Sequence, residues 1–124
     1  MSDYLWIFLG GGLGSMSRFG LGSILNKNFG EAFPFATLGS NLISSIVLGV
    51  LIGFLIIHPQ GNNNLKLLIG VGFCGGFSTF STFTLENFEL LQAGIASTAL
   101  LYTAISIVLC LLGMWLGFAL SKSF

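Results

Sequence analysis

The fold of this chain is decided by residues 72–83, which read GFCGGFSTFSTF inside a long apolar segment at residues 65–92. Gly75 and Gly76 lose more backbone entropy on folding than other residues, and the Ser and Thr side chains after them compete for backbone hydrogen bonds. The stretch therefore predicts a helix broken near residues 75–80. In a membrane, freed peptide groups are tolerated only where protein or a wet cavity satisfies them, so such a break marks an ion or substrate site.

The composition indicates that the surroundings of this stretch are a membrane. Of the 124 residues, 54% are hydrophobic and 6% are charged, whereas about a quarter of the residues in a soluble domain are charged. The formal net charge is zero, which leaves no basic patch for nucleic acid. Cys74 and Cys110 lie in apolar segments without disulfide or metal spacing, so we interpret them as small buried thiols. We expect an all-α integral membrane protein with a single domain.

Four segments of the chain are long enough to cross a bilayer as helices. Polar or Gly/Pro-containing stretches connect them, and the third segment is the broken one. The expected spans cover residues 4–25, 34–57, 65–92 and 95–120.

The basic residues do not favour one orientation of these spans. Four crossings place Lys66 and Lys122 on one side and Lys27 on the other, with Arg18 nearby. Orientation follows the imbalance of Lys and Arg between short loops, and here there is essentially none. We therefore expect the chain to insert both ways up and to pair antiparallel.

Polar residues form stripes on the second, third and fourth segments, and four helices alone cannot hide such stripes. A dimer is the simplest remedy. Asn41 either bonds a neighbouring helix or donates into a pore, and its polar neighbours favour the pore. Arg18 either snorkels to the interface or lies at the mouth of a polar pathway. The stripes contain Thr37, Ser40, Asn41, Ser44 and Ser45, and then Thr98, Tyr102, Ser106 and Cys110.

Residues 75–86, GGFSTFSTFTLE, closely resemble the broken-helix signature of the Fluc/CrcB fluoride channels. The resemblance also covers the glycine-rich first segment with Arg18 and the sequence TLGSNL at residues 37–42, and it extends to the length and the four-segment plan. It implies a fluoride-selective channel, not an enzyme, that exports fluoride down its electrochemical gradient. It also implies an antiparallel, dual-topology homodimer in the inner membrane of a bacterium.

The resemblance assigns roles to particular residues. A structural sodium ion at the dimer centre is expected on the backbone carbonyls of Gly75 and Ser78, since hard cations prefer oxygen. Aromatic rings carry a positive edge, and amide and hydroxyl groups donate hydrogen bonds, so both can contact an anion. The implied fluoride-pathway residues are Phe80, Phe83, Asn41, Ser81 and Thr82. The implied vestibule residues are Arg18, Glu86, Tyr102 and Ser106.

Two other functions are compatible with a small four-helix membrane protein. A small multidrug-type, proton-coupled antiporter needs a carboxyl group inside the membrane, and Glu86, toward the end of its segment, is the only candidate. A structural membrane subunit that transports nothing would gain little from polar stripes on three helices. The sequence also leaves open whether the partner in the dimer is a second copy or a related chain.

Overall fold

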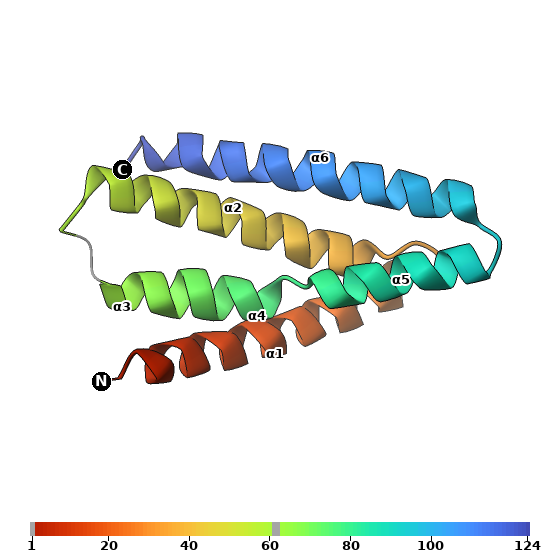
Figure 1. Ribbon diagram of the computed structural model, residues 1–124, viewed down its shortest axis with the longest axis horizontal. Helices are drawn as coiled ribbons and strands as arrows, with labels where there is room; N and C mark the ends of the chain where they lie inside the picture. The colour runs from red at the N-terminus through yellow and green to blue at the C-terminus, as the bar shows by residue number, and fades with distance from the viewer. Residues whose placement is uncertain (1, 61–62) are drawn as a thin grey trace.

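The computed structural model describes residues 2–60 and 63–124, and within those residues the regular structure is entirely helical. The polypeptide runs up and down as a bundle (Figure 1). In chain order the elements are α1 (Asp3–Phe29), α2 (Phe35–Ile57), α3 (Asn63–Leu65), the π-helix η1 (Lys66–Cys74), α4 (Gly75–Phe77), α5 (Phe80–Gln92) and α6 (Ala96–Ser121).

The helix boundaries agree with the predicted spans except at the end of the first one. Residues 26–28 look like part of a polar turn in the sequence, but they continue α1 to Phe29. The side chain of Asn28 donates a hydrogen bond to the carbonyl oxygen of Ile24 (2.8 Å), which satisfies it within the helix. Gly30 then ends α1 with a φ of 73°, a left-handed conformation that suits glycine.

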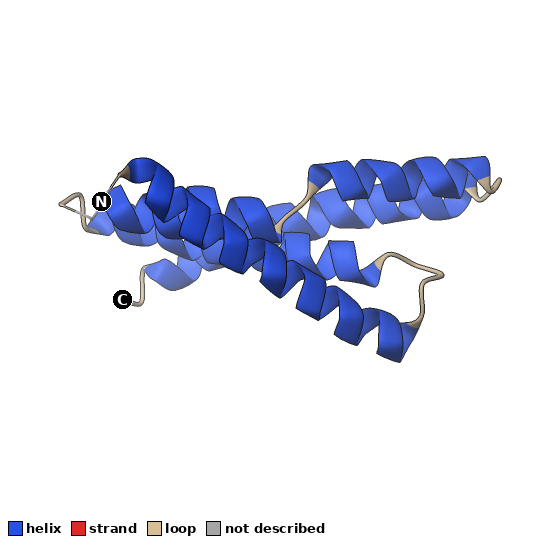
Figure 2. Cartoon of the chain, turned by 90° about the horizontal axis from the view of Figure 1, so that it is seen from below, coloured by secondary structure: helices blue, strands red, loops and turns tan. Residues whose placement is uncertain are grey.

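The two ends of the bundle follow the predicted topology. Both termini and the connection between α2 and α3 lie at one end, whereas the α1–α2 and α5–α6 connections lie at the other (Figure 1). The α2 and α6 helices run side by side, and α1 packs along η1 and α4. From below, α1 crosses the bundle obliquely (Figure 2).

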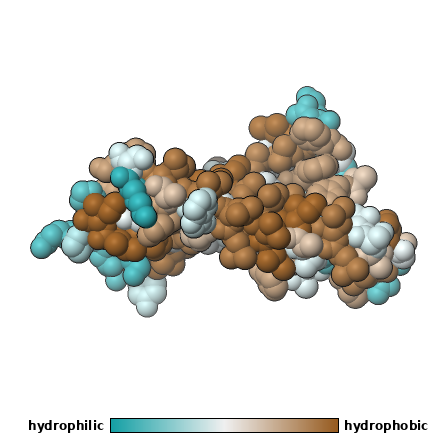
Figure 3. Space-filling model, turned by 90° about the horizontal axis from the view of Figure 1, so that it is seen from above, coloured by the Kyte–Doolittle hydropathy of each residue, from teal (hydrophilic) through white to brown (hydrophobic). Residues whose placement is uncertain are grey.

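The surface is that of a membrane protein. Three helical stretches among the described residues are long and apolar enough to cross a membrane: Phe35–Ile57, Asn63–Gln92 taken through the break, and Ala96–Ser121. Large apolar side chains such as Leu111 and Trp115 are exposed, and the face in Figure 3 is mostly hydrophobic with hydrophilic groups gathered toward the ends. The α1 helix has 27 residues but is not among the three, because glycine, serine and charged residues dilute its apolar ones.

The predicted break in the third segment is confirmed and lies at Ser78 and Thr79. Both residues have extended backbones, with ψ angles of 159° and 123°. The hydroxyl oxygen of Thr79 accepts a hydrogen bond from the backbone N–H of Thr82 (3.2 Å) and so caps α5. A threonine at this position satisfies one of the free N–H groups that every helix start exposes.

The segment before the break is wound as a π-helix, which the sequence did not indicate. Lys66–Cys74 forms η1 over nine residues, whereas most π-helices are single-turn bulges and many of them lie at functional sites. The α1 helix packs against η1 so closely that the two backbones are in contact. A Cβ on Gly10 would collide with the carbonyl oxygen of Leu68, and one on Gly14 would collide with that of Phe73.

Glycines also let α2 and α6 approach closely. A Cβ on Gly49 would collide with the carbonyl oxygen of Met114, and one on Gly117 would collide with that of Ile46. Helices in a membrane gain no hydrophobic energy from association, so they depend on such close packing. Gly49 and Gly117 therefore allow α2 and α6 to pack backbone to backbone.

Gly117→Ala should destabilise the protein even though alanine is the better helix former. Overpacking of this kind costs about 1–3 kcal/mol, and here the obstacle is backbone that cannot rotate away. The free energy of unfolding in mixed micelles measures the effect. Gly20→Ala is the matched control, since a Cβ there meets nothing within 4 Å. Equal stability of the two variants would contradict the packing described.

Candidate functional site

The backbone N–H and carbonyl oxygen of Thr79 are both held by one side chain from another helix. In a continuous helix its N–H would bond the carbonyl oxygen of Gly75, but here it donates to Oδ1 of Asn41 at 2.7 Å. The Nδ2 of Asn41 donates in turn to the carbonyl oxygen of Thr79 at 3.2 Å. Asn41 comes from α2 and is half-buried. The break is thus satisfied by α2 rather than by water.

At the break, the carbonyl oxygens of Gly75 and Ser78 lose the N–H donors that they would have in a continuous helix. The N–H of Thr79 is bonded to Asn41 instead of Gly75, and the N–H of Thr82 is bonded to the Thr79 hydroxyl instead of Ser78. Gly75 is exposed, and a Cβ there would meet nothing within 4 Å. Peptide oxygens relieved of an amide partner are suitable ligands for a hard cation. The Gly75 and Ser78 carbonyls therefore have the chemistry that a hard cation such as sodium requires.

The first half of the broken helix is held from the other side by α1. The Nε of Arg18 donates to the carbonyl oxygen of Gly76 at 3.1 Å, and the hydroxyl of Ser15 lies 3.5 Å from the same oxygen. Gly76 is at the carboxyl end of the η1–α4 helix, where a positive charge is favourable. Arg18 is half-buried and reaches across to α4, which argues against the snorkelling interpretation.

The carboxyl group of Glu86 is hydrogen-bonded to two other helices. Its Oε1 accepts from the hydroxyl of Thr37 on α2 at 2.6 Å, and its Oε2 accepts from the hydroxyl of Tyr102 on α6 at 2.7 Å. Thr37 is buried, and Tyr102 has no exposed surface. Glu86 therefore links α5 to both neighbouring helices inside the bundle, instead of extending from a helix end into solvent.

Four aromatic rings form a row that leads from the surface to this carboxyl group. The centroids of Phe80 and Phe83 are 5.6 Å apart, and that of Phe83 is 5.1 Å from Tyr102. Phe33 meets Tyr102 edge-on at 5.5 Å. Phe80 is 78% exposed, whereas Phe83 is half-buried. The two phenylalanines therefore share one face of α5, as their spacing predicted.

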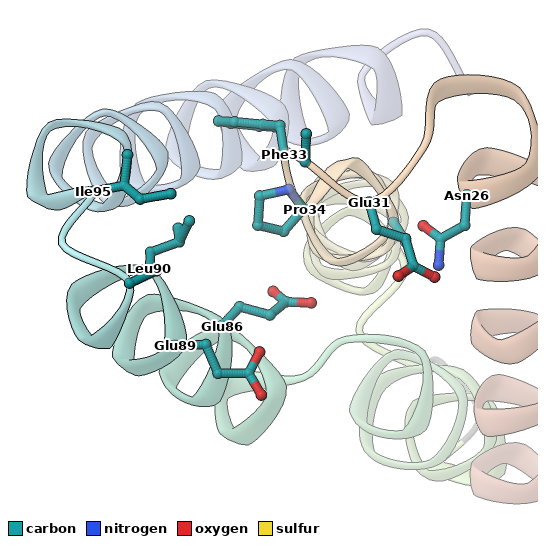
Figure 4. Close-up of a pocket in the computed structure, with 11 residues that line it drawn as sticks. Asn26, Glu31, Phe33, Pro34, Glu86, Glu89, Leu90 and Ile95 are labelled. Atoms are coloured by element: carbon teal, nitrogen blue, oxygen red, sulfur yellow. The ribbon is translucent and has the colours of Figure 1, made fainter.

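Two clefts meet at Glu86. One, of about 450 Å³, is polar and lies between α1, α2 and the start of α5, where Arg18, Thr79 and Thr82 line it. The other, of about 440 Å³, lies at the end of the bundle. Figure 4 shows Glu86 pointing into this second cleft, with Glu89 next to it on α5 and Glu31 beside Asn26 across from them.

The structure brings most of the predicted residues together, but not all of them. Arg18 and Glu86, predicted for the vestibule, line one cleft together with Thr82, which was predicted for the fluoride pathway. Ser81 is exposed, with its hydroxyl 3.3 Å from that of Thr79. Ser106 lines neither cleft described above. Its hydroxyl is buried and has no hydrogen-bond partner among residues 2–60 and 63–124.

Several residues of the site were not singled out from the sequence. Thr37 was placed by helical periodicity in the polar stripe of the second segment, but its bond to Glu86 was not foreseen. Thr79 precedes a helix as capping residues do, which is a signal that sequence reasoning can use. The contact of Phe33 with Tyr102 joins a connecting segment to α6, and nothing in the sequence indicates it.

Tyr102→Phe should destabilise the protein by about 1–3 kcal/mol, because it leaves one oxygen of the half-buried Glu86 carboxyl without its donor. The free energy of unfolding in mixed micelles is the measurement. In a protein that already carries Glu86→Met, Tyr102→Phe should cost less stability, because the hydrogen bond is absent both before and after the second substitution. Tyr4→Phe serves as the control, because Tyr4 is 84% exposed. Equal losses with and without Glu86 would show that the hydroxyl acts through another group.

Comparison with known proteins assigns the chain to a family. The family model described as CrcB-like protein, Camphor Resistance (CrcB), matches residues 5–118. "Fluoride-specific ion channel FluC" of Coxiella burnetii is 38% identical over 121 residues, which are 97% of this chain and 98% of that relative. The protein of the same name in Flavobacterium psychrophilum is 36% identical over 122 residues, 98% of each chain. In Beijerinckia indica it is 38% identical over 125 residues, 99% of this chain and 98% of the relative. These relatives carry the name of an ion channel and not of an enzyme, and the chain belongs to the CrcB-like protein family.

Proposed function

We propose that this protein is a fluoride-selective channel that lets fluoride leave the cell down its electrochemical gradient through the inner membrane of a bacterium. The observation that carries the proposal is the broken helix. Its second half carries Phe80 and Phe83, and Thr79 and Thr82 of the same segment line the polar cleft. The relatives of the chain bear the name of a fluoride-specific ion channel, which supports the proposal.

The proposed pathway follows the first turns of α5. Fluoride is small and strongly hydrated, so a pore must replace its water without trapping it. The ring edges of Phe80 and Phe83 offer weak positive contacts, which suit release from successive sites. Stronger hydrogen bonds come from the hydroxyls of Ser81 and Thr82 and from the amide of Asn41. One N–H of Asn41 is bonded to Thr79, and its second N–H is the one assigned to the anion.

The polar cleft serves as the vestibule in this proposal. Arg18 supplies a positive charge beside hydroxyl groups, which favours an anion at the entrance. Glu86 is held by Thr37 and Tyr102, so its carboxyl group forms a fixed wall of the cleft. Ser106 would contribute its buried hydroxyl from α6.

A second copy of the chain is needed to cover the break. Gly75, Phe80 and Ser81 are exposed in the single chain. Irregular backbone at membrane depth is tolerated only where protein or a wet cavity covers it. We propose an antiparallel homodimer in which both chains turn this face toward the pair, which requires four crossings per chain and dual topology. A structural sodium ion at its centre would be held by the Gly75 and Ser78 carbonyls of both chains, and its charge would favour an anion nearby.

The antiporter alternative receives less support. It requires a carboxyl group that releases its proton to a passing substrate, whereas both oxygens of Glu86 are engaged by hydroxyl donors from two helices. The relatives reported above are named as channels, which favours passive flow.

Phe80→Ile and Phe83→Ile should each reduce fluoride efflux from liposomes by at least about tenfold, because an aliphatic side chain has no positive ring edge to present to the anion. A fluoride electrode measures the efflux. Phe88→Ile is the matched control, since Phe88 is on the same helix, 56% exposed and five residues beyond Phe83, on another face. Efflux equal to that of the unmutated protein in both pore variants, with intact assembly, would remove the proposed role of the rings.

Accessibility of a tag at the C-terminus should be equal on the two faces of the cell membrane, because Lys and Arg are balanced between the connections. Labelling with a membrane-impermeant reagent, before and after permeabilisation, measures the fraction in each orientation. If every copy has one orientation, a homodimer of antiparallel chains is excluded and a related chain must be sought as the partner.

A further inference from the structure

The peptide of Thr79 is the point where the two halves of the broken helix are joined. Its N–H and its carbonyl oxygen are both bonded to Asn41, at 2.7 Å and 3.2 Å. Asn41 is 38 positions away in the sequence and on a different helix, so this is not a local turn. The same Thr79 caps α5 through its hydroxyl, and Phe80 follows it directly. Both hydrogen bonds to Asn41 are thus made at the residue that immediately precedes α5.

The chemistry of this contact suits an amide. The backbone of Thr79 presents one donor and one acceptor, the N–H of one peptide group and the carbonyl oxygen of the next, and an Asn or Gln amide carries an acceptor oxygen and an NH₂ donor side by side without charge. A hydroxyl can meet one of the two peptide groups in this geometry, and an aliphatic side chain meets neither. Within the membrane, a peptide group left unbonded is especially unfavourable because no bulk water replaces the partner.

We propose that Asn41 is a positioning residue that holds the Thr79 peptide and thereby fixes the start of α5 and the direction of Phe80 and Phe83. The consequence for transport depends on the proposed function, but the contact itself does not depend on fluoride. Asn41 acts in two ways: its Oδ1 and one N–H hold the backbone, and this orients the second N–H toward the pathway. Loss of Asn41 therefore displaces the rings as well as removing a donor.

Nuclear magnetic resonance of the purified protein in fluoride-free micelles tests the contact directly. Selective ¹⁵N-threonine labelling gives one backbone signal for each of Thr37, Thr79, Thr82, Thr84, Thr98 and Thr103. Thr79→Ser identifies the Thr79 signal by its disappearance. In the unmutated protein we expect a Thr79 amide proton shifted downfield by its short hydrogen bond and slow to exchange with deuterium, although it lies outside any helix.

Asn41→Leu and Asn41→Ala should speed the exchange of the Thr79 amide proton at least about tenfold, the factor that corresponds to loss of one hydrogen bond. Its signal should also move upfield. The signals of Thr98 and Thr103 on α6 should stay in place and so establish that the variant is folded. The smaller alanine supplies the result if leucine disturbs the bundle.

Ser45→Ala is the matched control. Its hydroxyl donates to the carbonyl oxygen of Asn41 within α2 (2.8 Å), so its removal disturbs the same turn of the helix without touching Thr79. The proposal is overturned if the Thr79 signal and its exchange rate are the same in a folded Asn41 variant as in the unmutated protein, or if Ser45→Ala changes them equally.

The outcome is separable from that of the proposed function. If the unmutated protein passes no fluoride yet Thr79 responds to Asn41 as described, the channel proposal fails and the positioning role stands. If fluoride efflux falls in the Asn41 variants while Thr79 is unchanged, Asn41 is an anion contact alone and the positioning role fails.

Discussion

The whole structure depends on one constraint, which is that the peptide groups freed by the break must find partners inside a membrane protein. Extended residues at Ser78 and Thr79 remove hydrogen bonds that a continuous helix would make. Two neighbouring side chains supply replacements. Asn41 from α2 bonds the N–H and the carbonyl oxygen of Thr79, and Arg18 from α1 bonds the carbonyl oxygen of Gly76. Ser44 adds a further contact by donating to the carbonyl oxygen of Cys74, which keeps its helical bond from the N–H of Ser78. Asn41 on α2 and Arg18 on α1 are thus explained by the backbone hydrogen bonds that are lost at the break.

The same constraint explains why glycine is placed where α1 and the broken helix meet. A side chain can reach a backbone oxygen across two helices only if their axes lie close together. A Cβ on Gly76 would collide with the carbonyl oxygen of Gly11, so the helix surfaces touch backbone to backbone. That closeness allows Arg18 to bond Gly76 with its Nε while the rest of its guanidinium lines the cleft. Packing and electrostatics are therefore satisfied by the same few positions.

Much of this arrangement could be predicted from the sequence, and the remainder has identifiable causes. The glycine pair followed by hydroxyl residues predicted the break, and apolar length predicted the helices. Helical spacing placed Phe80 and Phe83 on one face. Spacing, however, gives the face of a residue and not its partner, so the sequence could not tell that Asn41 bonds Thr79 or that Glu86 bonds Tyr102.

Two features of the backbone escaped prediction for a related reason. Polar residues at 26–28 are compatible with either a turn or a helix end, and the side-chain bond of Asn28 to Ile24 favours the helix. The π-winding of η1 leaves no mark in the hydrophobic pattern of Lys66–Cys74, because nearly all of its residues are apolar and every face looks alike. In both cases tertiary contacts decide between backbones that the local sequence allows.

Where α1 packs against the π-helix η1, the contacting residues recur at different sequence intervals on the two helices. Along α1 the contacting glycines, Gly10 and Gly14, repeat every four residues, while the carbonyl oxygens that they touch, on Leu68 and Phe73, repeat every five. The contacts stay aligned along the two helices because η1 has more residues per turn than α1. Tightening η1 to an ordinary α-helix would carry the Phe73 oxygen around the axis and away from Gly14, so the close packing of these helices needs both the unusual winding of η1 and the glycine spacing of α1.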